Sequence, residues 1–106
     1  MLSSVSLVKT LDKAFNTASI PVKLMNFGGA NRIDYDYSYA VYALNAFDII
    51  KAETVPADKE HLNVRLTLVN HSAGKNCTSV YQLPVNNNKM FADTLKTFLM
   101  GCTCCG

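Results

Sequence analysis

The regular alternation of apolar and polar residues over His61–Val69 is the feature that most constrains how this chain can fold. Apolar side chains occupy every second position: Leu62, Val64, Leu66 and Leu68. Polar side chains stand between them: His61, Asn63, Arg65 and Thr67. Successive side chains of a β-strand point to opposite faces, so this spacing predicts a strand with one face on a hydrophobic core and the other turned away.

Three more segments are predicted to be strands. Ile33–Tyr39 alternates polar and aromatic residues, which places its tyrosines on one face and its aspartates on the other. Phe47–Thr54 combines aromatic and β-branched residues, and Cys77–Val85 carries Pro84 near its end, as an edge or terminating position allows. Short polar connections lead into two of the strands: residues 55–60 precede His61–Val69, and residues 70–76 precede Cys77–Val85. Strands joined by such short connections are expected to be antiparallel.

The first thirty residues are less decisive. Residues 5–25 mix β-branched, apolar and polar residues, and Pro21 interrupts them. A helix over Leu7–Phe15 and a β-hairpin both fit this pattern, and we take the hairpin as the prediction. The glycine pair within Asn26–Asn31 predicts a turn, because glycine adopts positive φ at little cost.

A C-terminal helix is predicted over Lys89–Met100, after asparagines at positions 86 to 88 that can cap its first turn. Apolar residues recur at helical spacing on one stripe: Met90, Phe91, Leu95, Phe98 and Leu99. The last four of these are expected to form the core and the dimer contact of the helix. A helix of about three turns is marginal alone, so the stripe must pack on a sheet, either its own or that of a partner subunit.

These elements predict an α+β fold. The chain has 106 residues, which suffices for one hydrophobic core, and we expect a single domain over residues 1–106. Its expected architecture is an antiparallel β-sheet of about five strands with a C-terminal amphipathic helix that packs across a dimer.

Composition limits the possible partners. Apolar residues make up 49% of the chain and charged residues only 17%, so disorder is disfavoured and a largely neutral surface suits burial against other proteins. The net charge is +2, with six acids and three bases in residues 31–60 but one acid and four bases in residues 61–106. The C-terminal half could therefore bind phosphate groups, although scattered solubilising charge explains the same pattern.

No apolar run is long enough for a membrane span and the N-terminus does not resemble a secretory signal, so we expect no membrane partner and an intracellular origin.

No motif for catalysis or cofactor binding is present, and we expect no enzymatic activity, no cofactor and no metal site. His61 and His71 lie outside any metal-ligand motif and are expected at the surface. Asp34 and Asp36 share a strand face, where they could bind a cation or simply be solvated. The tyrosines at positions 35, 37 and 39 could stack nucleic-acid bases or line a core or a subunit interface.

Three cysteines crowd the C-terminus at positions 102, 104 and 105, and Cys77 is the fourth in the chain. A zinc site normally uses two spaced pairs of ligands, and a reactive thiolate is favoured at a helix N-terminus rather than after a C-terminus. The remaining alternatives are a tail without a defined role and disulfides between subunits of an assembly. The candidates for such disulfides are Cys77, Cys102, Cys104 and Cys105.

From Phe47 to Leu99, the order of elements resembles the coat proteins of single-stranded RNA bacteriophages: a strand, a turn with proline, an alternating strand, a polar loop, a further strand and a C-terminal helix. In that family two subunits join their sheets edge to edge, each C-terminal helix packs over the partner's sheet, and the other sheet face lines the capsid interior and binds RNA. The resemblance implies a capsid protein that dimerises, self-assembles into a shell in the host cytoplasm and becomes part of the virion. Residues 5–45 do not match the pattern.

The resemblance also implies which side chains would face RNA: Lys51, His61, Asn63, Arg65, Thr67 and Tyr81. It further implies that loop 70–76 contacts neighbouring subunits around the capsid axes. Two other functions fit the sequence: a small non-enzymatic interaction or accessory module, and a metal or redox protein that uses the cysteine tail.

Overall fold

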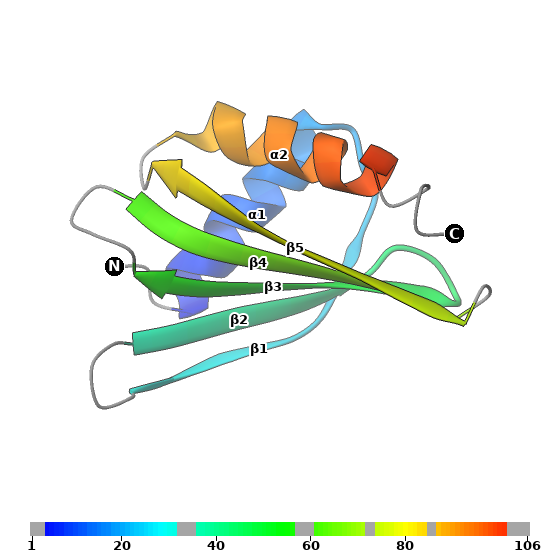
Figure 1. Cartoon of the computed structure of the whole chain (residues 1–106), viewed down its shortest axis with the longest axis horizontal. Helices are drawn as coiled ribbons and strands as arrows, with labels where there is room; N and C mark the ends of the chain where they lie inside the picture. Colours follow the sequence, from blue (N-terminus) through cyan, green and yellow to red (C-terminus); the bar gives the residue numbers. More distant parts are fainter. Residues whose placement is uncertain (1–3, 32–35, 57–60, 72–73, 85–86, 102–106) are drawn as a thin grey trace.

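Two helices lie on one face of a five-stranded antiparallel sheet in the computed structural model (Figure 1). The structure describes residues 4–31, 36–56, 61–71, 74–84 and 87–101. The elements follow one another in this order: α1 Ser4–Thr17, β1 Lys23–Asn31, β2 Asp36–Ala43, β3 Asp48–Pro56, β4 His61–Asn70, β5 Lys75–Pro84 and α2 Asn88–Gly101. The predicted α+β fold, with an antiparallel sheet and a C-terminal helix, is confirmed.

The sheet is a meander in which each strand pairs with the next one along the chain. Strand β4 lies between β3 and β5, and its Leu66 stands opposite Ala52 of β3. The alternation that predicted β4 is confirmed, because Leu62, Val64 and Leu66 are each only 1% exposed. Arg65, which lies between two of them, is exposed.

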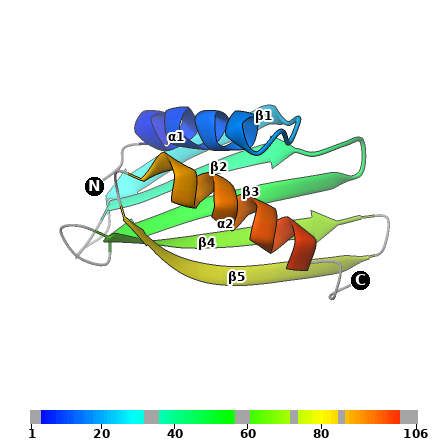
Figure 2. The same cartoon turned by 90° about the horizontal axis from the view of Figure 1, so that it is seen from above.

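Helices α1 and α2 pack against each other over the same face of the sheet (Figure 2). Leu7 and Leu11 of α1 and Phe91 and Phe98 of α2 are at most 1% exposed and share one hydrophobic cluster with the inward residues of the strands. Helix α2 therefore buries its apolar side on its own chain. Packing of this helix across a dimer is not needed to complete the core, and it stays a prediction.

Helix α2 begins at an asparagine cap, as the sequence predicted. The side-chain oxygen of Asn87 accepts a hydrogen bond from the backbone N–H of Met90 at 3.0 Å, which satisfies a donor that has no partner within the first helical turn. Of the predicted stripe, Phe91, Leu95 and Phe98 are buried, Leu99 is half-buried and Met90 is exposed. Ala92, which was not part of the predicted stripe, is buried at 2% exposure.

The predicted N-terminal hairpin is wrong, since residues 4–17 form helix α1. Its buried residues are Leu7, Leu11, Ala14 and Phe15, which recur at the spacing of one helix face. This face packs on α2, β1 and β2. The helix is favoured because its apolar face packs on α2 and on the sheet. The contact with α2 joins opposite ends of the chain, so the periodicity of residues 4–17 alone does not reveal it.

The predicted turn at Asn26–Asn31 is also wrong, because these residues belong to strand β1. The glycines serve close approach rather than chain reversal. A Cβ added at Gly29 would lie 2.6 Å from the backbone oxygen of Tyr37, and one at Gly28 would lie 3.1 Å from the Tyr39 ring. The strand thus passes closer to β2 than a residue with a side chain at position 29 would allow.

Candidate functional site

The sheet face opposite the two helices is not covered by any element in the described parts of the chain (Figure 1). We call it the open face. Strand register places five of the six predicted RNA-facing side chains there: Lys51, His61, Asn63, Arg65 and Thr67. Thr67 stands opposite Lys51, and Arg65 stands opposite Glu53. The structure therefore brings these five residues together on one surface.

Tyr81 is not part of this surface. It stands opposite Val64, which points into the core, and it packs against the hydrophobic cluster. Its ring lies edge-on to that of Phe98 in α2, with 6.4 Å between the ring centroids. The sequence-based grouping of Tyr81 with the open-face residues is wrong because β5 residues opposite the core side of β4 must themselves face the helices.

A buried carboxylate organises the centre of the open face. Glu53 is 8% exposed and receives two hydrogen bonds from Arg65, from Nε at 3.1 Å and from an Nη at 3.0 Å. The Tyr37 hydroxyl donates to the same carboxylate at 2.5 Å, and Lys51 Nζ lies 3.8 Å from it. Burial alone would raise the pKa of Glu53, but the hydrogen bonds from Arg65 and Tyr37 and the charges of Lys51 and Arg65 outweigh burial and hold it below its usual value. Glu53 is thus ionised at neutral pH and fixes the guanidinium in a bidentate geometry.

Two tyrosines lie beside this cluster. The rings of Tyr37 and Tyr39 are stacked with centroids 5.9 Å apart, and Lys51 Nζ lies 5.5 Å from the centre of the Tyr39 ring. The ring of Tyr39 also lies against Gly28 of β1, where a Cβ would contact it. The predicted tyrosine stripe is therefore on the open face and not in the core of this chain. Tyr35 of that stripe lies outside the described residues, as do Asp34 and the side chain of Asp36.

Basic groups outnumber acidic ones on the open face. Among its described side chains, Lys23, Lys51 and Arg65 are basic and Glu53 is acidic. A shallow pocket of about 210 Å³ lies between Glu53, Asn63, Arg65 and Val80. The surface therefore offers cations, amide and hydroxyl groups and exposed rings, which can bind phosphates and planar bases. The sequence analysis named Tyr37 as one of three candidate tyrosines but missed Glu53, whose partners follow from the pairing of β3 with β2 and β4.

The structure describes one of the four cysteines, Cys77, which belongs to the hydrophobic core. Cys77 is 7% exposed and stands opposite Leu68 on the helix side of the sheet, so a subunit disulfide at this position would require the core to open. Cys102, Cys104 and Cys105 lie outside the described residues. In the part of the chain that the structure describes, there is no group of three or more His, Cys, Asp or Glu side chains that could hold a metal ion.

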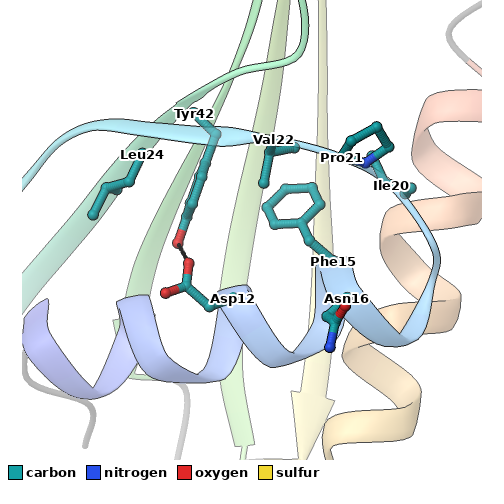
Figure 3. A pocket seen from close by; sticks show the side chains of 8 residues that line it. All are labelled: Asp12, Phe15, Asn16, Ile20, Pro21, Val22, Leu24 and Tyr42. Carbon is teal, nitrogen blue, oxygen red and sulfur yellow. Dashed lines mark hydrogen bonds between the residues drawn. The ribbon is translucent and has the colours of Figure 1, made fainter.

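A second hollow lies on the helix side, between the C-terminal half of α1 and the start of β1 (Figure 3). It has a volume of about 400 Å³, and both apolar and polar side chains line it: Asp12, Phe15, Asn16, Ile20, Pro21, Val22, Leu24 and Tyr42. The Tyr42 hydroxyl donates a hydrogen bond to Asp12 at 2.9 Å. Burial, this hydrogen bond and the charge of Asp12 raise the pKa of Tyr42 well above its usual value. We call this hollow the α1–β1 cleft.

No helix in the described residues is both long and apolar enough to cross a membrane. Comparison of the chain with models of protein families, with curated proteins and with solved structures gives no match.

Proposed function

We propose that this chain is the subunit of a self-assembling viral coat, like those of single-stranded RNA bacteriophages, and that its open face contacts RNA. The observation that carries the proposal is the division of the sheet into two unlike faces. Both helices cover one face, and the other presents basic, amide, hydroxyl and tyrosine groups over four strands. Under this proposal the shell assembles in the host cytoplasm and the protein is part of the virion.

The chemistry of the open face supports contact with RNA. Lys51 and Arg65 can neutralise phosphates, and Arg65 is half exposed although Glu53 holds its guanidinium. The rings of Tyr37 and Tyr39 are stacked, with Lys51 Nζ over the Tyr39 ring, which gives the open face an aromatic and cationic surface of the kind that contacts unpaired bases. RNA recognition by proteins relies on such stacking of unpaired bases together with contacts to phosphate.

The edges of the sheet support self-assembly. Strands β1 and β5 each pair with one neighbour in the described structure, so each has backbone groups that another strand could pair with. Both carry exposed apolar side chains, Met25 at 58% and Val80 at 61% exposure. A second copy could bury these side chains and extend the sheet.

The runner-up is a small interaction module that stays monomeric. One observation favours it: α2 already packs on its own sheet and on α1, so the hydrophobic core is complete within one chain. This candidate and the coat subunit differ in the size of the purified protein, because only the coat subunit forms a closed particle.

The first experiment is size-exclusion chromatography with light scattering, followed by negative-stain imaging, on the purified full chain. Discrete shells that contain nucleic acid support the coat subunit, whereas a monomer or dimer under every assembly condition contradicts it. Each measurement is repeated with reductant. Loss of the shells in reductant would assign Cys102, Cys104 and Cys105 to cross-linking between subunits.

Contact between the open face and RNA is tested with a matched pair of charge variants. Lys51→Gln removes a cation from the open face, and Lys96→Gln removes an exposed cation from α2. We expect Lys51→Gln to weaken RNA binding several-fold and to reduce the slope of log affinity against log salt by about 0.7. Equal effects of the two substitutions would mean that the open face is not the RNA surface.

A further inference from the structure

Strand β1 forms an edge of the sheet that is weakly protected against pairing with another strand. Its only strand partner in the described structure is β2, and Figure 1 shows it at the border of the sheet. Edge strands are normally guarded by charged side chains, proline or bulges. Lys23, at the first position, is the only charged residue of β1, and the strand contains no proline. Its one register shift, between Leu24 and Asn26, leaves residues 26–31 in regular pairing with β2.

An aromatic side chain lies at this edge. Phe27 is 42% exposed, although phenylalanine is a residue that folded chains normally bury. It stands opposite Ala40, which belongs to the core, so its side chain is on the helix side of the sheet. The backbone N–H of Phe27 donates to the side-chain oxygen of Asn26 at 2.9 Å. A strand added at the edge could replace this local acceptor with a backbone carbonyl.

The side chains of β1 change in size along the strand. The first half carries long or bulky side chains: Leu24, Met25, Asn26 and Phe27. The second half carries no side chain or a single methyl group: Gly28, Gly29 and Ala30. An antiparallel partner fits such a strand best when its small residues face the large ones and its large residues face the small ones. A second copy of β1, turned by a two-fold axis, has this order.

From this self-complementary order, we propose that β1 of a second copy pairs antiparallel with β1, with Gly28 on the two-fold axis. The register places Phe27 of each copy opposite Gly29 of the other on the helix side. On the open face it places Asn26 of each copy opposite Ala30 of the other. The two-fold axis forms each contact twice and closes the interface.

The pairing of Phe27 with Gly29 covers exposed surface on both copies. Gly29 is exposed, and an aromatic ring on the neighbouring strand shields the backbone of a glycine from water. The same kind of pair exists within one chain, where the Tyr39 ring lies against Gly28. Antiparallel pairing also keeps the two Lys23 side chains about 30 Å apart, whereas parallel pairing would place them side by side. A strand of another protein would satisfy the backbone groups of β1 without supplying the reversed order of sizes.

This inference rests on the self-association in the proposed function and deepens it, because it names the strand and the register that join two copies. A two-fold contact at β1 closes at a dimer. Because a closed shell needs interfaces around more than one axis, the β5 edge would remain available for a different contact.

The register is tested with cysteines on the open face of β1. Asn26→Cys and Ala30→Cys are prepared as separate chains at two exposed positions, each with Cys102, Cys104 and Cys105 replaced by serine. In the proposed register, the two new thiols of a mixed dimer stand directly opposite each other, within the span of a disulfide. In a dimer of either chain alone they would lie about 14 Å apart. We expect the mixture to form a covalent dimer under mild oxidation at least tenfold faster than either chain alone.

The edge that joins the copies is tested with a matched pair of lysine substitutions. Phe27→Lys removes the ring from β1 and places two like charges near the two-fold axis. Val80→Lys makes the same kind of change on β5, at a side chain that is 61% exposed. In sedimentation equilibrium, Phe27→Lys should weaken dimerisation at least tenfold and Val80→Lys less than twofold. Circular dichroism shows whether each variant folds, so a loss of association is not mistaken for unfolding.

Cross-linking that is no faster in the mixture than in the single chains would overturn the pairing, as would equal weakening by the two lysine substitutions. The outcomes also separate this inference from the proposed function. Shells that form normally from Phe27→Lys refute the β1 contact and leave the coat function standing. A cross-linked β1 dimer that never forms shells supports the pairing and refutes the coat function.

Discussion

Replacing Glu53 with glutamine removes the negative charge at the centre of the open face while nearly preserving the shape of the side chain. Three hydrogen bonds end on this carboxylate, one from Tyr37 and two from Arg65. Glutamine keeps one acceptor oxygen, but its amide group would turn N–H donors toward the guanidinium. At least one of the three hydrogen bonds is therefore lost.

The size of the effect follows from the unequal exposure of the two partners. Removing one member of a fully buried ion pair costs about 3–5 kcal/mol, whereas an exposed pair contributes about 0.2–1 kcal/mol. The side chain of Glu53 is 10% exposed and that of Arg65 is 52% exposed, so the guanidinium can regain water in the variant. We expect Glu53→Gln to lower the free energy of unfolding by about 1–2 kcal/mol, between these limits.

Urea unfolding followed by far-ultraviolet circular dichroism measures this loss. Asp93→Asn is the matched control, because it removes the same charge from an exposed position on α2 and should cost less than about 0.5 kcal/mol. A double-mutant cycle with Arg65→Met should give a coupling energy of about 1 kcal/mol. A coupling below about 0.3 kcal/mol would refute the ion pair as a source of stability.

The difference in the free energy of unfolding between the unmodified chain and Glu53→Gln should become smaller as the pH falls. The pKa of Glu53 in the folded chain lies below the usual value of 4.5, so the folded state binds fewer protons than the unfolded state. Its contribution is complete above pH 4.5 and is lost as the pH falls through the folded pKa. An advantage that grows on acidification would contradict this sign. Under the proposed RNA function, Glu53→Gln should also bind RNA more tightly, because the open face gains one unit of positive charge.

Three further substitutions test the packing that supports this surface. Phe98→Ala should lower the free energy of unfolding by about 3–5 kcal/mol in urea, since this ring is 1% exposed in the core; a loss below 1 kcal/mol would contradict its position. Asn87→Ala should cost about 1 kcal/mol by the same assay through loss of the cap on Met90, and an unchanged midpoint would mean that the cap does not stabilise α2. Gly29→Ala should cost about 1–3 kcal/mol, because the new methyl group would meet the Tyr37 backbone oxygen; a neutral thermal midpoint would show that β1 can move away.

The sequence predicts those elements whose own pattern of apolar residues matches the face that they bury. Strand β4 alternates because one side packs on the helices and the other meets water, and the boundaries of α2 follow from a cap and an apolar stripe. Helix α1 could not be assigned in this way, since what selects it is contact with α2 from the far end of the chain. The glycines of β1 were predicted to form a turn, because their role depends on the short distance between β1 and β2. The sequence around the glycines does not reveal this distance.

The same limit applies to the candidate site. Alternation alone placed His61, Asn63, Arg65 and Thr67 on one face, and this grouping holds in the structure. The cluster around Glu53 depends on the register between β3 and β4, so it became visible only when the strand pairs were known. Assignment of Tyr81 required the register between β4 and β5 in the same way.

The order of elements along the chain has a consequence for biosynthesis. The strands can pair successively as they leave the ribosome, because every partner is the next strand in sequence. Helix α1 contacts β1 and β2, whereas α2 contacts β5 and reaches α1. While the C-terminal segment is still inside the ribosome, the strands that have emerged therefore present an apolar face without α2, whose Phe91, Leu95 and Phe98 belong to the same hydrophobic cluster in the folded chain. Until this 14-residue helix leaves the ribosome, the apolar face would be open to chaperones or nascent neighbours.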